Sequence, residues 1–173
     1  MKKILITFVT FFVICFSIWF QSNFLNSIPL AGVIANLGIV LIAGVGLVSG
    51  KVLGGVIGFV YGLLIDITIY QSLGLYVLLY SLTGIIAGFL NHKFSKDNKI
   101  SMIMLILFTT IIFESLLYLF NVLVNRFEFQ LKFWFFTIVL ETMYNILLTV
   151  LFYRPITFLG DLLNRCKNSY YLL

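Results

Sequence analysis

The chain has 173 residues, of which 62% are hydrophobic and only 10% are charged, and its formal net charge is +5. A soluble domain is nearer half apolar and a quarter charged, so this composition excludes an ordinary soluble protein and indicates an integral membrane protein. The basic residues lie in short segments between long apolar runs. That placement is typical of membrane topology signals rather than of nucleic-acid binding.

The N-terminal segment, MKKILITFVTFFVICFSIWF, combines two lysines with a long apolar stretch, as a signal peptide does. No small-residue cleavage site follows, because Trp19, Phe20 and Gln21 stand there. We therefore expect this segment to be retained as the first transmembrane helix, with a cleaved signal peptide as the alternative.

The rest of the chain divides into further apolar stretches of spanning length. A spanning helix needs roughly 20 predominantly apolar residues, and the alternation expected of barrel strands is absent. The sequence therefore predicts an all-α membrane bundle of six helices over residues 1–153, with a tight turn at Gly50-Lys51. The expected spans are 4–22, 30–49, 52–70, 73–91, 100–124 and 133–153. Residues 154–173 predict a short cytoplasmic amphipathic tail that lies on the inner membrane surface or binds a cytoplasmic partner.

The basic residues predict the orientation of this bundle, because lysine and arginine concentrate on the cytoplasmic side. With the N-terminus inside, the inner segments hold nine basic residues and the outer segments two, Arg126 and Lys132. The nine are Lys2, Lys3, Lys51, Lys93, Lys96, Lys99, Arg154, Arg165 and Lys167. Both termini are therefore expected in the cytoplasm.

A glycine ladder occupies the third span and ends on an acid. Gly54, Gly58, Gly62 and Asp66 recur every fourth residue, and the fourth span has a shorter series, Gly84 and Gly88. Residues four apart share a helix face, and small residues let helix backbones approach closely within a membrane. The ladder therefore predicts either close packing within the chain or docking of a partner helix. For Asp66 the alternatives are capping of the fourth span and a polar contact with a partner.

Two acids lie deeper in the last two spans, Glu114 in the fifth and Glu141 in the sixth. Intramembrane acids usually face the interior of a bundle. Protonation, or hydrogen bonds to Thr110, Tyr118, Tyr144 or Asn145, would let them join the two spans. The alternative is a proton or ligand site of a transporter.

The sequence has no recognisable motif for catalysis, metal binding or phosphate binding. The only histidine, His92, lies in a linker, and no His/Cys/Asp cluster has the spacing of a metal site. Gly50-Lys51 does not fit a phosphate-binding loop, because Val45 and Val52 replace the required glycine and hydroxyl residue. We expect no catalytic residues, no cofactor and no metal, and give little weight to a lipid-modifying enzyme.

The central segment, GGVIGFVYGLLIDITIYQSLGLYVLLYSLTGIIAGFL, resembles the rod shape-determining protein MreD family. The resemblance rests on Gly58, Gly62 and Asp66, on LGLY at 73–76, and on Gly84 and Gly88. Asn145 shortly before YRP is a weaker match, and Asn36-Leu37 departs from the proline often found near the start of the second span.

The resemblance implies a non-enzymatic component of the cell-elongation machinery, which scaffolds lateral peptidoglycan synthesis in the bacterial cytoplasmic membrane. Its implied partners are MreC above all, then MreB, RodA and a class B penicillin-binding transpeptidase, together with the lipid bilayer. It also implies a fold similar to the S component of energy-coupling-factor transporters. Such a vitamin-binding subunit is the alternative function, but the first span lacks the alanines through which S components dock.

Overall fold

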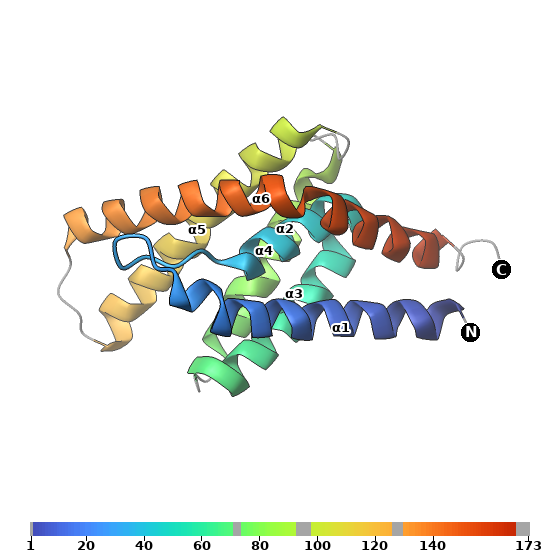
Figure 1. Ribbon diagram of the computed structural model, residues 1–173, viewed down its shortest axis with the longest axis horizontal. Coiled ribbons are helices and arrows are strands. Elements are labelled where there is room, and N and C mark those ends of the chain that lie inside the picture. Colours follow the sequence, from blue (N-terminus) through green and yellow to red (C-terminus); the bar gives the residue numbers. More distant parts are fainter. Residues whose placement is uncertain (1, 71–73, 93–97, 126–129, 169–173) are drawn as a thin grey trace.

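A computed structural model describes residues 2–70, 74–92, 98–125 and 130–168 of the chain. These residues form six α-helices and no β-strand, so the predicted all-α class is confirmed (Figure 1). The α-helices are α1 (Lys2–Asn23), α2 (Leu37–Ser49), α3 (Lys51–Ile65), α4 (Leu75–Phe89), α5 (Lys99–Asn125) and α6 (Leu131–Asn168). Short turns are η1 (Leu25–Ser27), the π-helical η2 (Asp66–Tyr70) and η3 (Leu90–His92).

Four helical segments are long and apolar enough to cross a membrane: Ile4–Ser27, Lys51–Ile69, Lys99–Val124 and Leu131–Asn164. The helices α2 and α4 are shorter, with 13 and 15 residues. A 13-residue helix extends for about 20 Å, whereas the hydrocarbon core is roughly 30 Å thick. Six crossings therefore stay a prediction.

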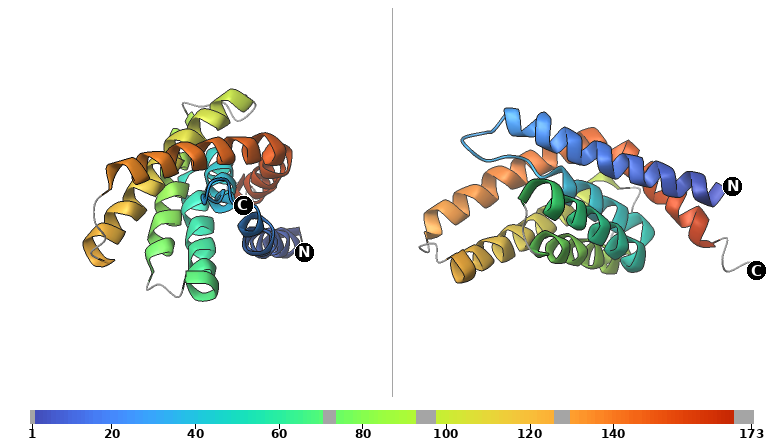
Figure 2. Two further views of the ribbon diagram at one scale, coloured as in Figure 1. Left: turned by 60° about the vertical axis from the view of Figure 1, so that its left-hand side comes forward. Right: turned by 90° about the horizontal axis from the view of Figure 1, so that it is seen from below.

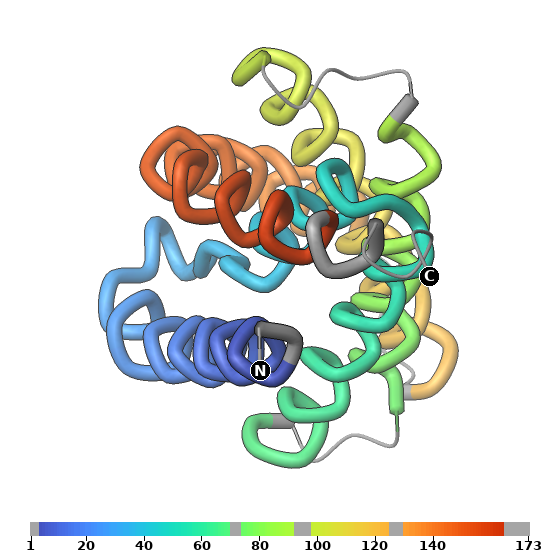
Figure 3. The backbone as a smooth tube through the Cα atoms, turned by 90° about the vertical axis from the view of Figure 1, so that its right-hand side faces the viewer, coloured from blue at the N-terminus to red at the C-terminus, as the bar shows by residue number. Residues whose placement is uncertain are grey.

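The short helix α2 is the centre of the bundle. All of its residues are buried, and α3, α4, α5 and α6 pack around it (Figures 1 and 3). A helix that is apolar all round is stable only when it is covered on every side, by protein or by lipid. The sequence of α2, LGIVLIAGVGLVS, is apolar on all faces, and the surrounding helices cover it. The helix α1 contacts the bundle less extensively, along α2 and α6.

The segment before α2 corrects the expected start of the second span at residue 30. Leu30 and Val33 exchange two backbone hydrogen bonds, of 2.8 and 3.0 Å, around a tight turn. Ala31 and Gly32 both have positive φ in this turn, 51° and 84°. The helix begins only after Asn36, whose side chain accepts a hydrogen bond from the Ile39 amide at 3.2 Å. Hydropathy misplaced this boundary because the turn and cap residues lie among apolar neighbours.

The other connections fall into two groups. The predicted tight turn at Gly50-Lys51 is confirmed: α2 ends at Ser49, α3 starts at Lys51, and Gly50 has a φ of +86° that favours glycine. The turn expected at residues 71–72 and the centres of the linkers at 93–97 and 126–129 lie outside the described residues.

The C-terminal tail is not a separate helix, which corrects the expected boundary at residue 153. The helix α6 continues through Pro155 to Asn168. Ile156, Leu159 and Leu163 are buried, whereas Phe158 is exposed. The tail continues α6 because its buried apolar side chains extend the face that packs against α2.

Polar contacts hold the tail and the end of α2 together. The Ser49 hydroxyl donates to the Gly160 carbonyl at 3.1 Å, and the Asn164 amide donates to the Val48 carbonyl at 2.6 Å. The Asn91 amide, in η3, also donates to the Leu47 carbonyl. The start of α1 and the end of α6 lie at one end of the molecule (Figure 1).

Candidate functional site

The glycine ladder of α3 lies against the backbone of α4 (Figure 2). A methyl group on Gly54 would stand 2.5 Å from the Gly84 carbonyl oxygen. On Gly58 it would overlap the Tyr80 carbonyl group, and on Gly62 the backbone at the start of α4. Only glycine allows this approach, so these three residues set the distance between the two helices.

The glycines of α4 complete the same contact from the other side. A methyl group on Gly84 would overlap the Gly54 carbonyl, and one on Gly88 would overlap the backbone of Gly50 and Lys51. The ladder is therefore occupied within the chain. A partner helix could reach it only if α3 and α4 separated.

Asp66 joins the same two helices at their far end. Its carboxylate accepts hydrogen bonds from the backbone amides of Tyr76 and Val77, at 3.3 and 3.1 Å. The first amides of a helix lack intrahelical partners, and a carboxylate there also faces the positive end of the helix dipole. Of the two alternatives for Asp66, the geometry therefore favours capping of α4.

A second polar cluster surrounds the start of α2, which we call the α2 cap network: Gln21, Asn36, Tyr80, Thr110 and Asn145. Asn145 is fully buried; its side-chain oxygen accepts from the Asn36 amide at 2.8 Å and its amide donates to the Thr110 hydroxyl at 3.1 Å. The Tyr80 hydroxyl donates to the Asn36 side chain at 2.8 Å. The network thus links α4, α5 and α6 to the non-helical backbone before α2.

Gln21, on α1, forms hydrogen bonds with the backbone on both sides of Asn36. Its amide donates to the Ala35 carbonyl at 2.7 Å, and its side-chain oxygen accepts from the Leu37 amide at 2.9 Å. Sequence reasoning found Asn145 but missed Gln21 and Tyr80. The available signals were a glutamine at the end of an apolar helix and an asparagine, Asn36, in the capping position before an apolar run.

Glu114 and Glu141 come together between α5 and α6. Their carboxyl groups lie within hydrogen-bonding reach of each other, and Glu141 also reaches Asn145. Two of the expected partners bond elsewhere: the Tyr118 hydroxyl pairs with the Gln130 backbone, and the Tyr144 hydroxyl donates to the Ile28 carbonyl at 3.0 Å. The polar contact between the last two helices is therefore made by the two acids together with the Asn145–Thr110 hydrogen bond.

The two acids line a cavity of about 380 Å³. The residues at 31–36, the end of α1 and the start of α4 form the rest of its wall, together with α5 and the first turns of α6. Glu141 is buried, and its Oε1 has no hydrogen-bond partner. Within the described part of the chain, no three His, Cys, Asp or Glu side chains are grouped as metal ligands.

Comparison with protein families shows the family of this chain. The family model for the rod shape-determining protein MreD matches residues 1–161, which include every residue of the ladder, the α2 cap network and the acid pair. The chain belongs to the MreD family. No curated protein and no solved structure matches the chain, so the likeness of the MreD fold to S components stays a prediction for it.

Membership of the MreD family makes the chain a membrane component of rod-shape determination. The apolar helices agree with the family's place in the bacterial inner membrane. The roles of Gly54, Gly58, Gly62, Asp66, Gly84 and Gly88 toward partners, and any functional role of Glu114, Glu141 and Asn145, stay predictions.

Proposed function

We propose that the chain is a non-catalytic scaffold of the cell-elongation machinery, which holds partner proteins through contacts between helices within the bilayer. It would cross the membrane six times, with both termini in the cytoplasm. MreC is the first partner we propose, with MreB, RodA and a class B penicillin-binding transpeptidase in the same complex. The match to the MreD family over residues 1–161 carries this proposal.

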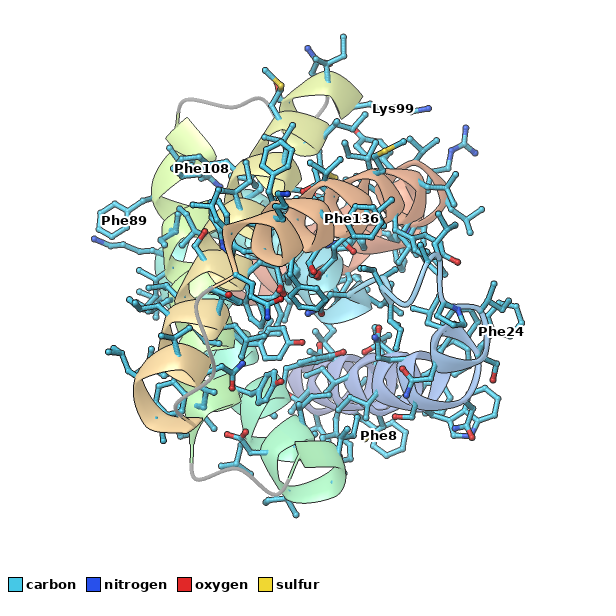
Figure 4. The ribbon with its side chains drawn as sticks, turned by 90° about the vertical axis from the view of Figure 1, so that its left-hand side faces the viewer. Phe8, Phe24, Phe89, Lys99, Phe108 and Phe136 are labelled. Carbon is cyan, nitrogen blue, oxygen red and sulfur yellow. The ribbon has the colours of Figure 1, made fainter. Side chains whose placement is uncertain are left out.

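The distribution of side chains on the bundle supports a role in the plane of the membrane. Phe8, Phe12 and Trp19 on α1 are 68%, 62% and 59% exposed, and Figure 4 shows Phe8 on the outer side of that helix. The helices α5 and α6 also carry exposed large apolar residues, including Phe136. Such surfaces face lipid or another membrane protein, because exposure of so much apolar surface to water is unfavourable.

Because the glycine ladder packs within the chain, partner helices must bind to the outer faces of the bundle. Small-residue faces commonly join helices in membranes, but here the ladder closes α3 onto α4. We therefore propose that partner helices dock on the outer surfaces of the bundle and that the ladder keeps those surfaces in place.

Depletion of the protein in its own bacterium tests the proposal. We expect rods to become round, and we expect MreC and RodA to accumulate normally but to stop co-purifying with each other. Re-expression of the intact chain should restore both properties. Rods that stay intact, with growth that becomes dependent on an added vitamin, would instead indicate the transport subunit.

A further inference from the structure

The cavity beside the acid pair has the chemistry of a binding site rather than of a packing defect. Its volume of about 380 Å³ lies in the range of small-molecule sites. It is bordered by the turn segment 31–36 and by Asn26, which follow the end of α1, so it lies at the end of the bundle opposite the termini. Apolar packing defects carry no polar groups, whereas this wall holds two carboxyl groups.

Two polar groups of this wall are buried without a hydrogen-bond partner. Glu141 is 5% exposed and its Oε1 has no hydrogen-bond partner, and the Thr137 hydroxyl one turn away on α6 is also buried without a partner. Glu114 brings a second carboxyl group to the same wall, beside Glu141. None of the described residues that line the cavity is basic. A buried acceptor of this kind is stabilised by a donor from outside the chain.

Aromatic rings form the other part of the wall. Tyr76, Phe113, Phe133 and Phe136 come from α4, α5 and α6 and line the same cavity as the acids. The faces of aromatic rings attract organic cations. Carboxylates together with aromatic rings therefore select a positively charged nitrogen that carries an apolar substituent.

We propose that this cavity binds an alkylammonium group, with the ammonium donating to Glu141 and its carbon substituent lying against the aromatic rings. Two sources share that chemistry, the ethanolamine headgroup of a membrane lipid and a free organic amine. This binding goes beyond the scaffold function and does not depend on it, because a scaffold can hold a bound molecule.

Binding of free amines is tested on the purified full-length chain in detergent, with phenethylammonium as the probe and neutral 2-phenylethanol as its matched control. We expect a saturable rise in melting temperature with the ammonium alone. Glu141→Gln should weaken binding by about tenfold or more, as for a lost hydrogen bond to a charged group. Asp161→Asn, which removes an acid of the same helix outside the cavity, should leave binding unchanged.

A second variant keeps the test informative if Glu141→Gln does not fold. Phe136→Leu keeps an apolar side chain on a half-exposed position but removes the ring, and we expect it to weaken ammonium binding several-fold. Equal stabilisation by 2-phenylethanol, or equal binding by Phe136→Leu and the intact chain, would overturn the proposal.

The lipid source is tested in nanodiscs. We compare discs of phosphatidylglycerol alone with discs that contain phosphatidylethanolamine in equal amount. Higher stability in the mixed discs that is lost in Glu141→Gln would assign the cavity to the lipid headgroup, whereas binding of the free probe without a lipid effect would assign it to a small amine. No response to either source would overturn the proposal.

Discussion

At the scale of single residues, Asn145 carries the strongest prediction, because both ends of its buried amide are used. It accepts from the Asn36 amide and donates to the Thr110 hydroxyl. Polar contacts between membrane helices contribute about 0.6 kcal/mol on average and up to about 1.7. Since Asn145 makes two and its loss leaves the partly buried Asn36 amide unpaired, we expect Asn145→Ala to lower the free energy of unfolding by about 1–2 kcal/mol. Unfolding of the purified chain in a detergent series measures the change.

The matched control for Asn145 lies two residues away on the same helix. Met143 is 65% exposed, so Met143→Ala should change the free energy of unfolding by less than about 0.5 kcal/mol. Equal stability of the two variants would mean that the α2 cap network does not hold the non-helical segment in place.

At the scale of secondary-structure elements, the pair α3 and α4 depends on glycine at named positions. A methyl group on Gly58 would overlap the Tyr80 backbone, and the backbone cannot move as a side chain can. Overpacking costs about 1–3 kcal/mol. We therefore expect Gly58→Ala to lower the free energy of unfolding by about 2 kcal/mol, and Gly58→Leu to abolish accumulation in the membrane. Unfolding measurements and immunoblots of membranes check the two variants.

Gly55 supplies the control for this prediction, because it lies on α3 but beside the ladder. A methyl group there would meet only the Ile85 side chain, which can rotate. Alanine also favours helix over glycine by up to about 1 kcal/mol, so Gly55→Ala should be neutral or slightly stabilising. If Gly58→Leu accumulated normally and only lost a partner, the ladder would be a docking face after all.

The elements also show which parts of the fold a sequence can predict. Spacing alone identified the ladder, because a face of glycines at every fourth residue has few uses other than close packing. Hydropathy placed the start of α2 at residue 30, since Leu30, Val33 and Ile34 are as apolar as helix residues. The true start depends on Gln21 and Asn145, which reach Asn36 and its neighbours from helices distant in sequence.

The candidate cavity could not be predicted from the sequence for the same reason. Intramembrane acids pointed to Glu114 and Glu141, but a cavity also requires the turn segment 31–36 and Tyr76 of α4 to meet α5 and α6. Sequence patterns indicate which residues share one face of a helix. They do not report which faces leave space between them.

At the scale of the whole molecule, hydrogen bonds show which of the described connections lie together at each end of the bundle. Asn91 and Asn164 meet the last carbonyls of α2, which places the Gly50-Lys51 turn beside the tail of α6. At the opposite end, Tyr144 contacts Ile28 beyond the end of α1. Lys51 lies in that turn, at the first end, and the positive-inside rule predicts that this end is cytoplasmic.

Cysteine labelling in intact cells tests this orientation. In a background with Cys15 and Cys166 replaced by serine, Asn26→Cys should react fully with a membrane-impermeant maleimide, because Asn26 is exposed at the end that we predict to lie outside the cell. Lys51→Cys, which is exposed in the α2–α3 turn, should react only after permeabilisation. Reaction of Lys51→Cys in intact cells, with protection of Asn26→Cys, would reverse the topology. Reaction of both from outside would mean that α2 does not carry the chain back across the membrane.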